Sequence, residues 1–432
     1  MAVIKFRRPD AARPGSGADA AGRERQEPQG GAFFSQETDK QTAETPSRRQ
    51  GVSDYARKIR SHRVSVFLRV MLTVAAVAAI AALVIVQLEN RIFTEATFTK
   101  AADIHAVEGT VYRNFSGTIL FYSKDGAGCT DTKGNARWNI TYEMQRPLVA
   151  VCGDVVAIGD YGGSTVYVMD TDGQMGTVDT DLPIRALSVA KNGTVAAVLG
   201  DTNAAWVNMF RADGTLIEQA KMTMKQMGYP LSISVSPNGE LLCVSHLQVD
   251  GTSVKTSVAF YNFGAVGQNY SDNCVSGFDY AGEVVPYVRF LDDATSIAVS
   301  DSRLAFFNGK QIPQNGTNNL FSENLEGVYH SENYAALLFA DATGAHEHRL
   351  DLYNTAGSKV NSIGFDLDYT DIQLAGDRII ISNGQECQIY STAGVQKYAG
   401  EFGRSVSAVI PSQRSNVLTV VTDEAIETMT LR

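Results

Sequence analysis

The fold is decided by residues 229–264, which read YPLSISVSPNGELLCVSHLQVDGTSVKTSVAFYNFG. An apolar run opens at Pro230, a turn signal follows at Ser236–Gly239, a second apolar run (ELLCVS) comes next, and a strand-like run closes at Gly264. Proline lacks a backbone donor and is tolerated at the first residue of a strand, and Asn-Gly supplies the backbone conformation of a tight turn. The segment therefore predicts a β-meander, with antiparallel strands joined by short turns.

The same pattern recurs along the chain. Strand-like runs close at seven glycines, which lie 37–50 residues apart and about 43 on average: Gly134, Gly173, Gly214, Gly264, Gly309, Gly357 and Gly394. Prolines open a strand at the same place in four units, at Pro147, Pro183, Pro230 and Pro286. Each unit also contains an apolar run, and the eighth of these runs is VLTVV near the C-terminus. A period of this length is the signature of a repeat architecture, so the chain contains about eight copies of one unit.

A unit this short cannot bury both faces of its sheet alone, but a ring of units around an axis buries them and leaves only short edges. We therefore predict an all-β fold, a β-propeller of eight blades over residues 103–432, with seven blades as the alternative. The last unit ends at Arg432 without room for a fourth strand. We expect residues 103–113 to supply that strand and to close the ring.

The chain upstream of the repeats has a different composition. Residues 1–63 hold long polar stretches with few apolar residues, too few to offset the entropy of ordering, so we predict a disordered tail. The 17 residues from Val70 to Val86 carry no charge, and a helix of this length roughly matches a hydrocarbon core of about 30 Å. We predict a transmembrane signal anchor at residues 64–88 and a linker at residues 89–102. A cleaved signal peptide and a buried soluble helix are the alternatives.

Charge predicts the orientation of this anchor and excludes one class of partner. Basic residues crowd its N-terminal side, at Arg57, Lys58, Arg60, Arg63 and Arg69. The N-terminus is therefore expected in the cytoplasm, with the propeller outside the cell membrane. Residues 1–88 carry a net charge of +6 and residues 89–432 a net charge of -16. Because phosphate backbones are bound by clustered Lys and Arg, we expect no nucleic-acid partner.

Two stretches carry a family resemblance. Ser236–Leu242 (SPNGELL) resembles the turn of WD40-like propeller repeats, and Asp131–Trp138 (DTKGNARW) resembles the end of a quinoprotein-type blade. Only the first unit keeps this Trp, because Trp206 precedes its turn glycine, so no quinone cofactor is expected. The layout of tail, anchor and propeller resembles an uncharacterised family of single-pass membrane-anchored β-propeller proteins of Gram-positive bacteria. That resemblance implies an architecture and no activity.

The side chains with the potential for catalysis or metal binding form no recognisable site. The five cysteines have no C-x-x-C spacing, so we expect no metal, although one disulfide among them is an alternative. His346 and His348 would lie on one side of an extended segment, but two ligands without a third do not define a metal site. The cluster Asp366, Asp368 and Asp371 is interpreted as a solvated loop. No nucleophile motif is present, and we expect no cofactor and name no catalytic residue.

One set of residues is predicted by the repeat itself. The innermost strand of each blade lines the central channel, and four arginines fall at or near the starts of such strands: Arg146, Arg185, Arg289 and Arg404. In an acidic domain, guanidinium groups that converge on one channel mouth would form a local site for carboxylate or phosphate. The alternative is that each arginine pairs with a neighbouring carboxylate such as Glu143 or Asp371.

These features favour a binding or scaffolding module. We predict that the propeller presents loops to a protein or cell-envelope ligand, since loops on a rigid scaffold are where partners dock. The alternative is an extracytoplasmic enzyme that acts on wall polymer or peptide through residues of the central channel. A sensor that couples ligand binding to the tail is a third hypothesis.

Overall fold

The computed structural model describes residues 65–81, 87, 91–104, 109–200, 204–222, 228–251 and 253–432. The chain divides into two compact units, Met1–Ile80 and Ala81–Arg432. Residues 65–81 are helical, and within the described ranges no helix combines the length and the apolar character that a membrane crossing needs. The predicted tail and part of the predicted anchor, including residues 82–86, lie outside the described residues.

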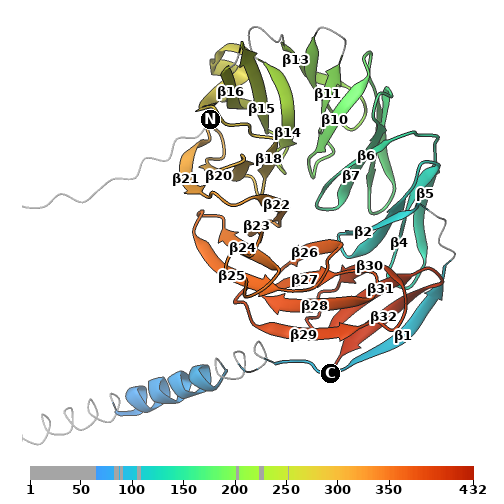
Figure 1. The fold of residues 1–432 in the computed structure, drawn as a ribbon, viewed down its shortest axis with the longest axis vertical. Helices are drawn as coiled ribbons and strands as arrows, with labels where there is room; N and C mark the ends of the chain where they lie inside the picture. Colours follow the sequence, from blue (N-terminus) through green and yellow to red (C-terminus); the bar gives the residue numbers. More distant parts are fainter. Residues whose placement is uncertain are drawn as a thin grey trace, which may run out of the picture. The chain divides into compact units, whose positions relative to one another are not determined.

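The propeller consists of eight four-stranded antiparallel sheets arranged in a ring (Figure 1). Blade 1 contains β2 (Val111–Phe115), β3 (Thr118–Tyr122), β4 (Gly126–Thr130) and β5 (Ala136–Thr141). Blade 2 contains β6 (Pro147–Cys152), β7 (Val155–Asp160), β8 (Thr165–Asp170) and β9 (Gln174–Asp179). Blade 3 contains β10 (Ile184–Val189), β11 (Val195–Gly200), β12 (Ala205–Phe210) and β13 (Leu216–Met222). Blade 4 contains β14 (Tyr229–Val235), β15 (Leu241–Asp250), β16 (Ser253–Asn262) and β17 (Cys274–Ala281), with short 3₁₀ turns at Gly267–Asn269 and Ser271–Asn273.

The second half of the ring repeats the same order. Blade 5 contains β18 (Tyr287–Phe290), β19 (Thr295–Val299), β20 (Arg303–Asn308) and β21 (Gln314–Leu320). Blade 6 contains β22 (Leu325–His330), β23 (Tyr334–Ala340), β24 (His348–Asn354) and β25 (Lys359–Phe365). Blade 7 contains β26 (Asp371–Ala375), β27 (Arg378–Ser382), β28 (Glu386–Ser391) and β29 (Gln396–Glu401). Blade 8 contains β30 (Val406–Pro411), β31 (Val417–Thr422), β32 (Ala425–Leu431) and β1 (Ala96–Asp103). The predicted eight-bladed, all-β propeller is confirmed, and the seven-bladed alternative is wrong.

The ring is closed by a strand from the N-terminal end of the propeller, as expected, but the predicted segment is wrong. The closing strand is β1, which pairs with β32 from Ala96 opposite Leu431 to Asp103 opposite Ala425. Residues 96–102, predicted as linker, therefore belong to blade 8, and residues 111–115 form the innermost strand of blade 1 instead. The error arose because β1 (ATFTKAAD) lacks the turn signals and the apolar run that mark the other strands.

The first strand of each blade is innermost, and these strands run in the same direction along the channel. Hydrogen bonds to serine hydroxyls show how these strands are aligned. Ser188 accepts from the backbone N–H of Val235, and Ser234 accepts from that of Phe290, so the ends of neighbouring inner strands lie side by side. We call the face where inner strands begin the start face, and the opposite face the end face. Turns between first and second strands, such as Ser236–Gly239, lie on the end face, and the segments that join blades lie on the start face.

The core is divided among the eight interfaces between neighbouring blades. Each of the eight apolar clusters combines residues of two adjacent blades, as when Phe260 of blade 4 packs edge-on against Phe307 of blade 5, with ring centroids 5.1 Å apart. Polar contacts add to this packing. Trp138, taken from the quinoprotein-like motif, donates its indole N–H to the Asp170 carbonyl of blade 2 at 2.7 Å. Both sequence motifs therefore act as structural devices.

Candidate functional site

The structure brings two of the four predicted arginines together. Arg146 precedes β6 and Arg185 is the second residue of β10, so both lie on the start face. Their guanidinium carbons lie 4.7 Å and 5.0 Å from the ring centroid of Tyr161. Tyr161 follows β7, and 38% of its surface remains exposed. These three side chains, which we call the Tyr161 group, come from segments that the sequence separates by up to 39 residues.

Backbone hydrogen bonds hold the Tyr161 group in place. The Asp160 carboxylate accepts from the backbone N–H of Arg146 at 2.7 Å and from that of the preceding residue at 3.1 Å. Gly162, whose φ of +90° favours glycine, donates to the Ile184 carbonyl at 2.8 Å, and Ile184 donates back to the same loop at 2.9 Å. The loop after β7 is thus tied to the starts of both β6 and β10, and this places the two arginines beside one ring.

The two guanidinium groups of the Tyr161 group have no bonded counter-ion among the described residues, and the nearby Asp160 carboxylate accepts from backbone N–H groups instead. Within the part of the chain that the structure describes, neither Arg146 nor Arg185 forms an ion pair, and Glu143 and Asp371 do not bond to them. A cation over an exposed aromatic ring is stabilised by about 0.5–1 kcal/mol. This contact orients the guanidinium without using its N–H donors. Both guanidinium groups therefore keep N–H donors that no described residue uses, and these can bind a carboxylate or phosphate, the bidentate partners of arginine.

Arg404 lies elsewhere and is paired, as the alternative interpretation predicted for these arginines. Its guanidinium donates to both oxygens of Glu427 at 2.6 Å and 2.8 Å. It also lies 4.9 Å from the ring centroid of Phe98, on the outermost strand of blade 8. Only 10% of the Glu427 side chain is exposed. Arg404 therefore stabilises blade 8 and its closing strand.

Arg289 lies near the end face, and so the four arginines do not converge on one mouth. It follows Pro286 by three residues, which is roughly 10 Å along a strand. Its guanidinium Nη2 donates to the Val151 carbonyl at 2.8 Å and so links blade 5 to blade 2. The prediction treated residues at the start of an inner strand and residues three positions further along it as equivalent, but they face opposite mouths of the channel.

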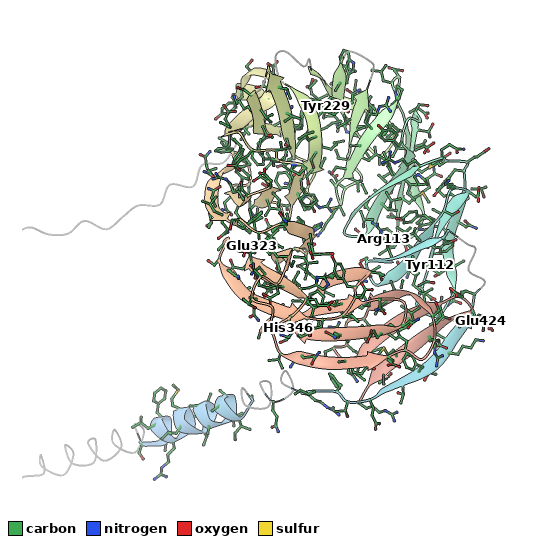
Figure 2. All side chains as sticks on the ribbon, viewed as in Figure 1. Tyr112, Arg113, Tyr229, Glu323, His346 and Glu424 are labelled. Atoms are coloured by element: carbon green, nitrogen blue, oxygen red, sulfur yellow. The ribbon has the colours of Figure 1, made fainter. Side chains whose placement is uncertain are left out.

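Sequence reasoning missed two cavities that described residues form along the channel. One, of about 450 Å³, opens on the end face and is lined by Arg289, Lys191 and Arg113 among others. The other, of about 630 Å³, lies among blades 1, 6, 7 and 8 and also includes Arg113. Figure 2 shows Arg113 near the middle of the ring. Arg113 was missed because residues 103–113 were assigned to the outer closing strand; the correct strand order would have placed it on the inner wall.

The other sequence candidates do not assemble into a catalytic or metal site. All five cysteines are free thiols. Cys152 lines the end-face cavity, and burial raises its pKa despite the nearby guanidinium of Arg289, so this thiol stays protonated at neutral pH. His346 bonds to Asp366, whereas His348 bonds to Glu326. No group of three metal-ligating side chains occurs among the described residues.

Comparison with known proteins places the chain in a family. None of the curated proteins matches this sequence. Among solved structures the chain is similar to BamB from Moraxella catarrhalis, with 12% identity, a TM-score of 0.46 and coverage of 78% of this chain and 100% of that chain. It is also similar to Sqt1 from Saccharomyces cerevisiae, with 11% identity, a TM-score of 0.47 and coverage of 79% and 99%. Matches at such identities concern the fold alone. The model of a family of unknown function, DUF5711, matches residues 89–431, and the chain therefore belongs to the DUF5711 family.

Proposed function

We propose that this protein is a binding module held at the cell membrane by a signal anchor at residues 64–88, with its propeller outside and its tail in the cytoplasm. The start face of the propeller binds a protein or cell-envelope polymer that carries carboxylate or phosphate groups. The observation that supports this function is the Tyr161 group, in which two arginines that form no ion pair with any described residue flank an exposed tyrosine. The rest of the proposal, its location included, follows from the sequence pattern.

The composition of the Tyr161 group favours binding. Tyrosine and arginine are enriched among the few residues that supply most of the energy of protein interfaces. A second exposed tyrosine, Tyr229, lies at the start of β14 on the same face, with 41% of its surface exposed. Because residues 89–432 carry a net charge of -16, the positive charge at Arg146 and Arg185 is a local feature that would orient an anionic partner toward this face.

Crosslinking from intact membranes tests the binding face. The full-length protein carries a photo-crosslinking residue in place of Tyr229, and partners are compared between the otherwise unchanged protein and the Arg146→Gln/Arg185→Gln variant. Since charge-assisted hydrogen bonds contribute about 1.5–3 kcal/mol each, the double variant should reduce capture on the order of tenfold or more. Arg414→Gln is the matched control, because Arg414 is an exposed arginine in the turn after β30 on the opposite face. Equal capture by the double variant and the control would refute the proposed face.

A separate experiment tests the membrane orientation. Intact cells that carry an N-terminal tag on this protein are treated with an external protease, before and after permeabilisation. We expect the propeller to be cleaved in intact cells, while the tag is lost only after permeabilisation. Protection of the propeller in intact cells would contradict the extracytoplasmic location and leave the result on the binding face unaffected.

A further inference from the structure

The end-face cavity contains a half-buried guanidinium, that of Arg289, without a counter-ion among the described residues. Arg289 bonds to the Val151 carbonyl through Nη2, while its Nε is buried and has no hydrogen-bond partner. Burying a cationic group is costly unless it is paired and hydrogen-bonded. The ring thus holds a guanidinium in the channel with donor capacity that the described protein atoms do not use.

The other charges of this cavity leave its inner part positive. Lys191 and Glu332 bond to each other at 2.5 Å, from the end-face turns of blades 3 and 6, and so largely cancel at the rim. Arg113 adds a second guanidinium, whose carbon lies 5.8 Å from the ring centroid of Tyr122. Within the described residues, Glu332 is the one carboxylate that lines the cavity. Two arginines therefore share the cavity without an acidic partner of their own.

The acidic residues beside the cavity are bonded elsewhere. Asp292 accepts from the backbone N–H groups of Ala294 and Thr295, in the turn that leads into β19, at 2.6 Å and 2.7 Å. Asp293 accepts from the backbone N–H of Asn238 at 2.8 Å. Burial, with the charge of Arg289 as the second cause, lowers the pKa of His330 to about 3, so this histidine is neutral at physiological pH. It can donate or accept a hydrogen bond without adding charge.

Part of the wall is apolar. Val149, Ala150 and Leu187 line the cavity, and each keeps part of its surface exposed toward the channel. A volume of about 450 Å³ falls within the range of small-molecule sites. Cationic donors on one part of the wall and aliphatic side chains on another match a ligand with an anionic group and a compact apolar body.

We propose that the end-face cavity binds a small organic anion, a phosphate monoester or a carboxylate, with its charged group between Arg289 and Arg113 and its body against Val149, Ala150 and Leu187. This site is distinct from the start-face surface and does not depend on it. The ligand enters from the end face past the Lys191–Glu332 pair, and its charge neutralises the Arg289 guanidinium.

Titration calorimetry of the full-length protein in detergent tests this site with three probes: inorganic phosphate, phenyl phosphate and benzoate. We expect phenyl phosphate or benzoate to bind, and phenyl phosphate to bind more tightly than inorganic phosphate because its ring covers the apolar wall. Arg289→Gln should weaken binding on the order of tenfold or more, Arg289→Lys should weaken it less, and Arg414→Gln should leave it unchanged. If none of the probes binds, or if Arg289→Gln binds them as well as the unchanged protein, the proposal is wrong.

A second variant and a second measurement distinguish loss of the binding site from loss of folding. Arg113→Gln removes the other guanidinium without touching the link from Arg289 to Val151, and it should also weaken binding. In NMR spectra of the histidine rings, assigned with His330→Gln, a bound anion should raise the pKa of His330, because it offsets the charge of Arg289. Binding without any change at His330 would place the anion at another site and overturn the proposal.

Discussion

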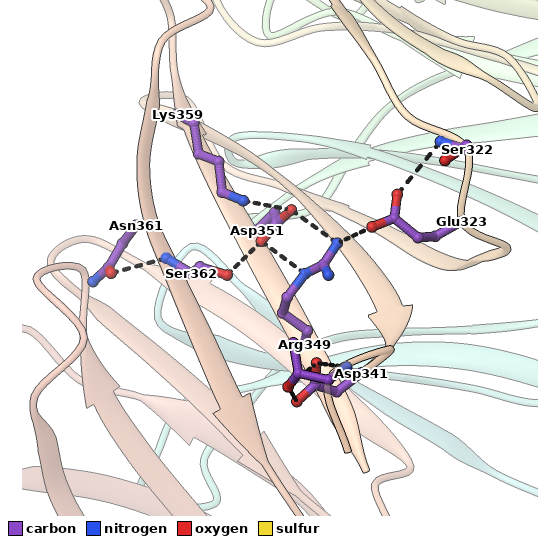
Figure 3. Close-up of polar contacts among 9 residues, drawn as sticks. Ser322, Glu323, Asp341, Arg349, Asp351, Lys359, Asn361 and Ser362 are labelled. Carbon is purple, nitrogen blue, oxygen red and sulfur yellow. Dashed lines mark hydrogen bonds and ion pairs between the residues drawn. The ribbon is translucent and has the colours of Figure 1, made fainter. Parts of the chain in front are cut away.

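At the scale of single residues, Asp351 is the centre of a polar network in blade 6 (Figure 3). Its carboxylate accepts from Ser362 Oγ at 2.6 Å and lies 2.8 Å from Lys359 Nζ and 3.3 Å from Arg349 Nε. Only 5% of the side chain is exposed. We predict that Asp351→Ala lowers the free energy of unfolding by about 3 kcal/mol, because removal of one partner leaves buried charge uncompensated. Urea unfolding of the full-length protein measures this loss.

Glu323 provides the comparison for this network. It accepts from the same Arg349 at 3.0 Å, but its side chain is 36% exposed, so solvent screens the pair. Glu323→Gln should therefore cost less than about 1 kcal/mol. Similar losses for Asp351→Ala and Glu323→Gln would show that burial does not set the strength of these contacts.

A second residue-scale prediction concerns Glu283, in the segment that joins blades 4 and 5, and the pH dependence of its contribution to the stability of the fold. Its carboxylate accepts from Arg303 Nη2 at 2.8 Å and from Ser300 Oγ at 2.9 Å, and these contacts lower its pKa from the ordinary value of 4.5. A carboxylate whose pKa is lower in the folded state stabilises the fold above its unfolded pKa and loses that contribution as the pH falls through its folded pKa. Glu283→Gln should therefore destabilise the protein at pH 7 and much less at pH 3, when both are measured by urea unfolding.

The matched substitution for this pH profile is Glu347→Gln. Glu347 is exposed, and its side chain forms no ion pair within the described part of the propeller. Its replacement should leave the pH profile unchanged. A Glu283→Gln effect that stays constant from pH 7 to pH 3 would show that the ionised carboxylate contributes nothing.

At the scale of elements, the closing strand β1 decides whether blade 8 is complete. It covers β32 from Ala96 to Asp103, and Phe98 packs with the apolar cluster that contains Met429 and Leu431. A protein that begins at residue 91 should keep its full thermal stability, whereas one that begins at residue 104 should expose the β32 edge, melt at lower temperature and aggregate. Thermal unfolding and size-exclusion chromatography distinguish the two. Equal melting temperatures would contradict the assignment of β1 as the closing strand.

At the scale of the whole molecule, the interface between blades 8 and 1 has the smallest apolar cluster that the described residues form. Between blades 8 and 1 the described residues form a cluster of four buried side chains: Ile119, Ile410, Val421 and Ile426. The seven other interfaces bury nine to twelve side chains each. A cavity of about 480 Å³ lies beside this interface. Because local stability follows apolar burial, we predict that the ring opens first here.

Native-state hydrogen exchange measures this opening. Amides of β3 and β31, which face this interface, should exchange roughly tenfold faster than those of β11 and β15, which flank the well-packed interface between blades 3 and 4. Ile119→Ala should widen the difference, because it removes one of the four buried side chains. Uniform protection around the ring would show that the cluster size does not govern opening.

The sequence by itself determined the repeat, the eight blades and the turns that join their strands. These depend on local chemistry: Pro230 opens a strand, and Gly239, with a φ of +78°, closes a tight turn with a hydrogen bond to Ser236 at 2.8 Å. Such signals act within a few residues, so they are readable in one chain and recur with the period of the blade.

Only the tertiary structure decided which segment closes the ring and which arginines meet. β1 pairs with a strand more than 300 residues away, and no local signal selects residues 96–103 over residues 103–113. Arg146 and Arg185 meet at Tyr161, Arg404 binds Glu427, and Arg289 faces the opposite mouth. The physical reason is the same in each case: ring closure and channel lining are contacts between distant segments, and their geometry is set by how the blades pack around the axis.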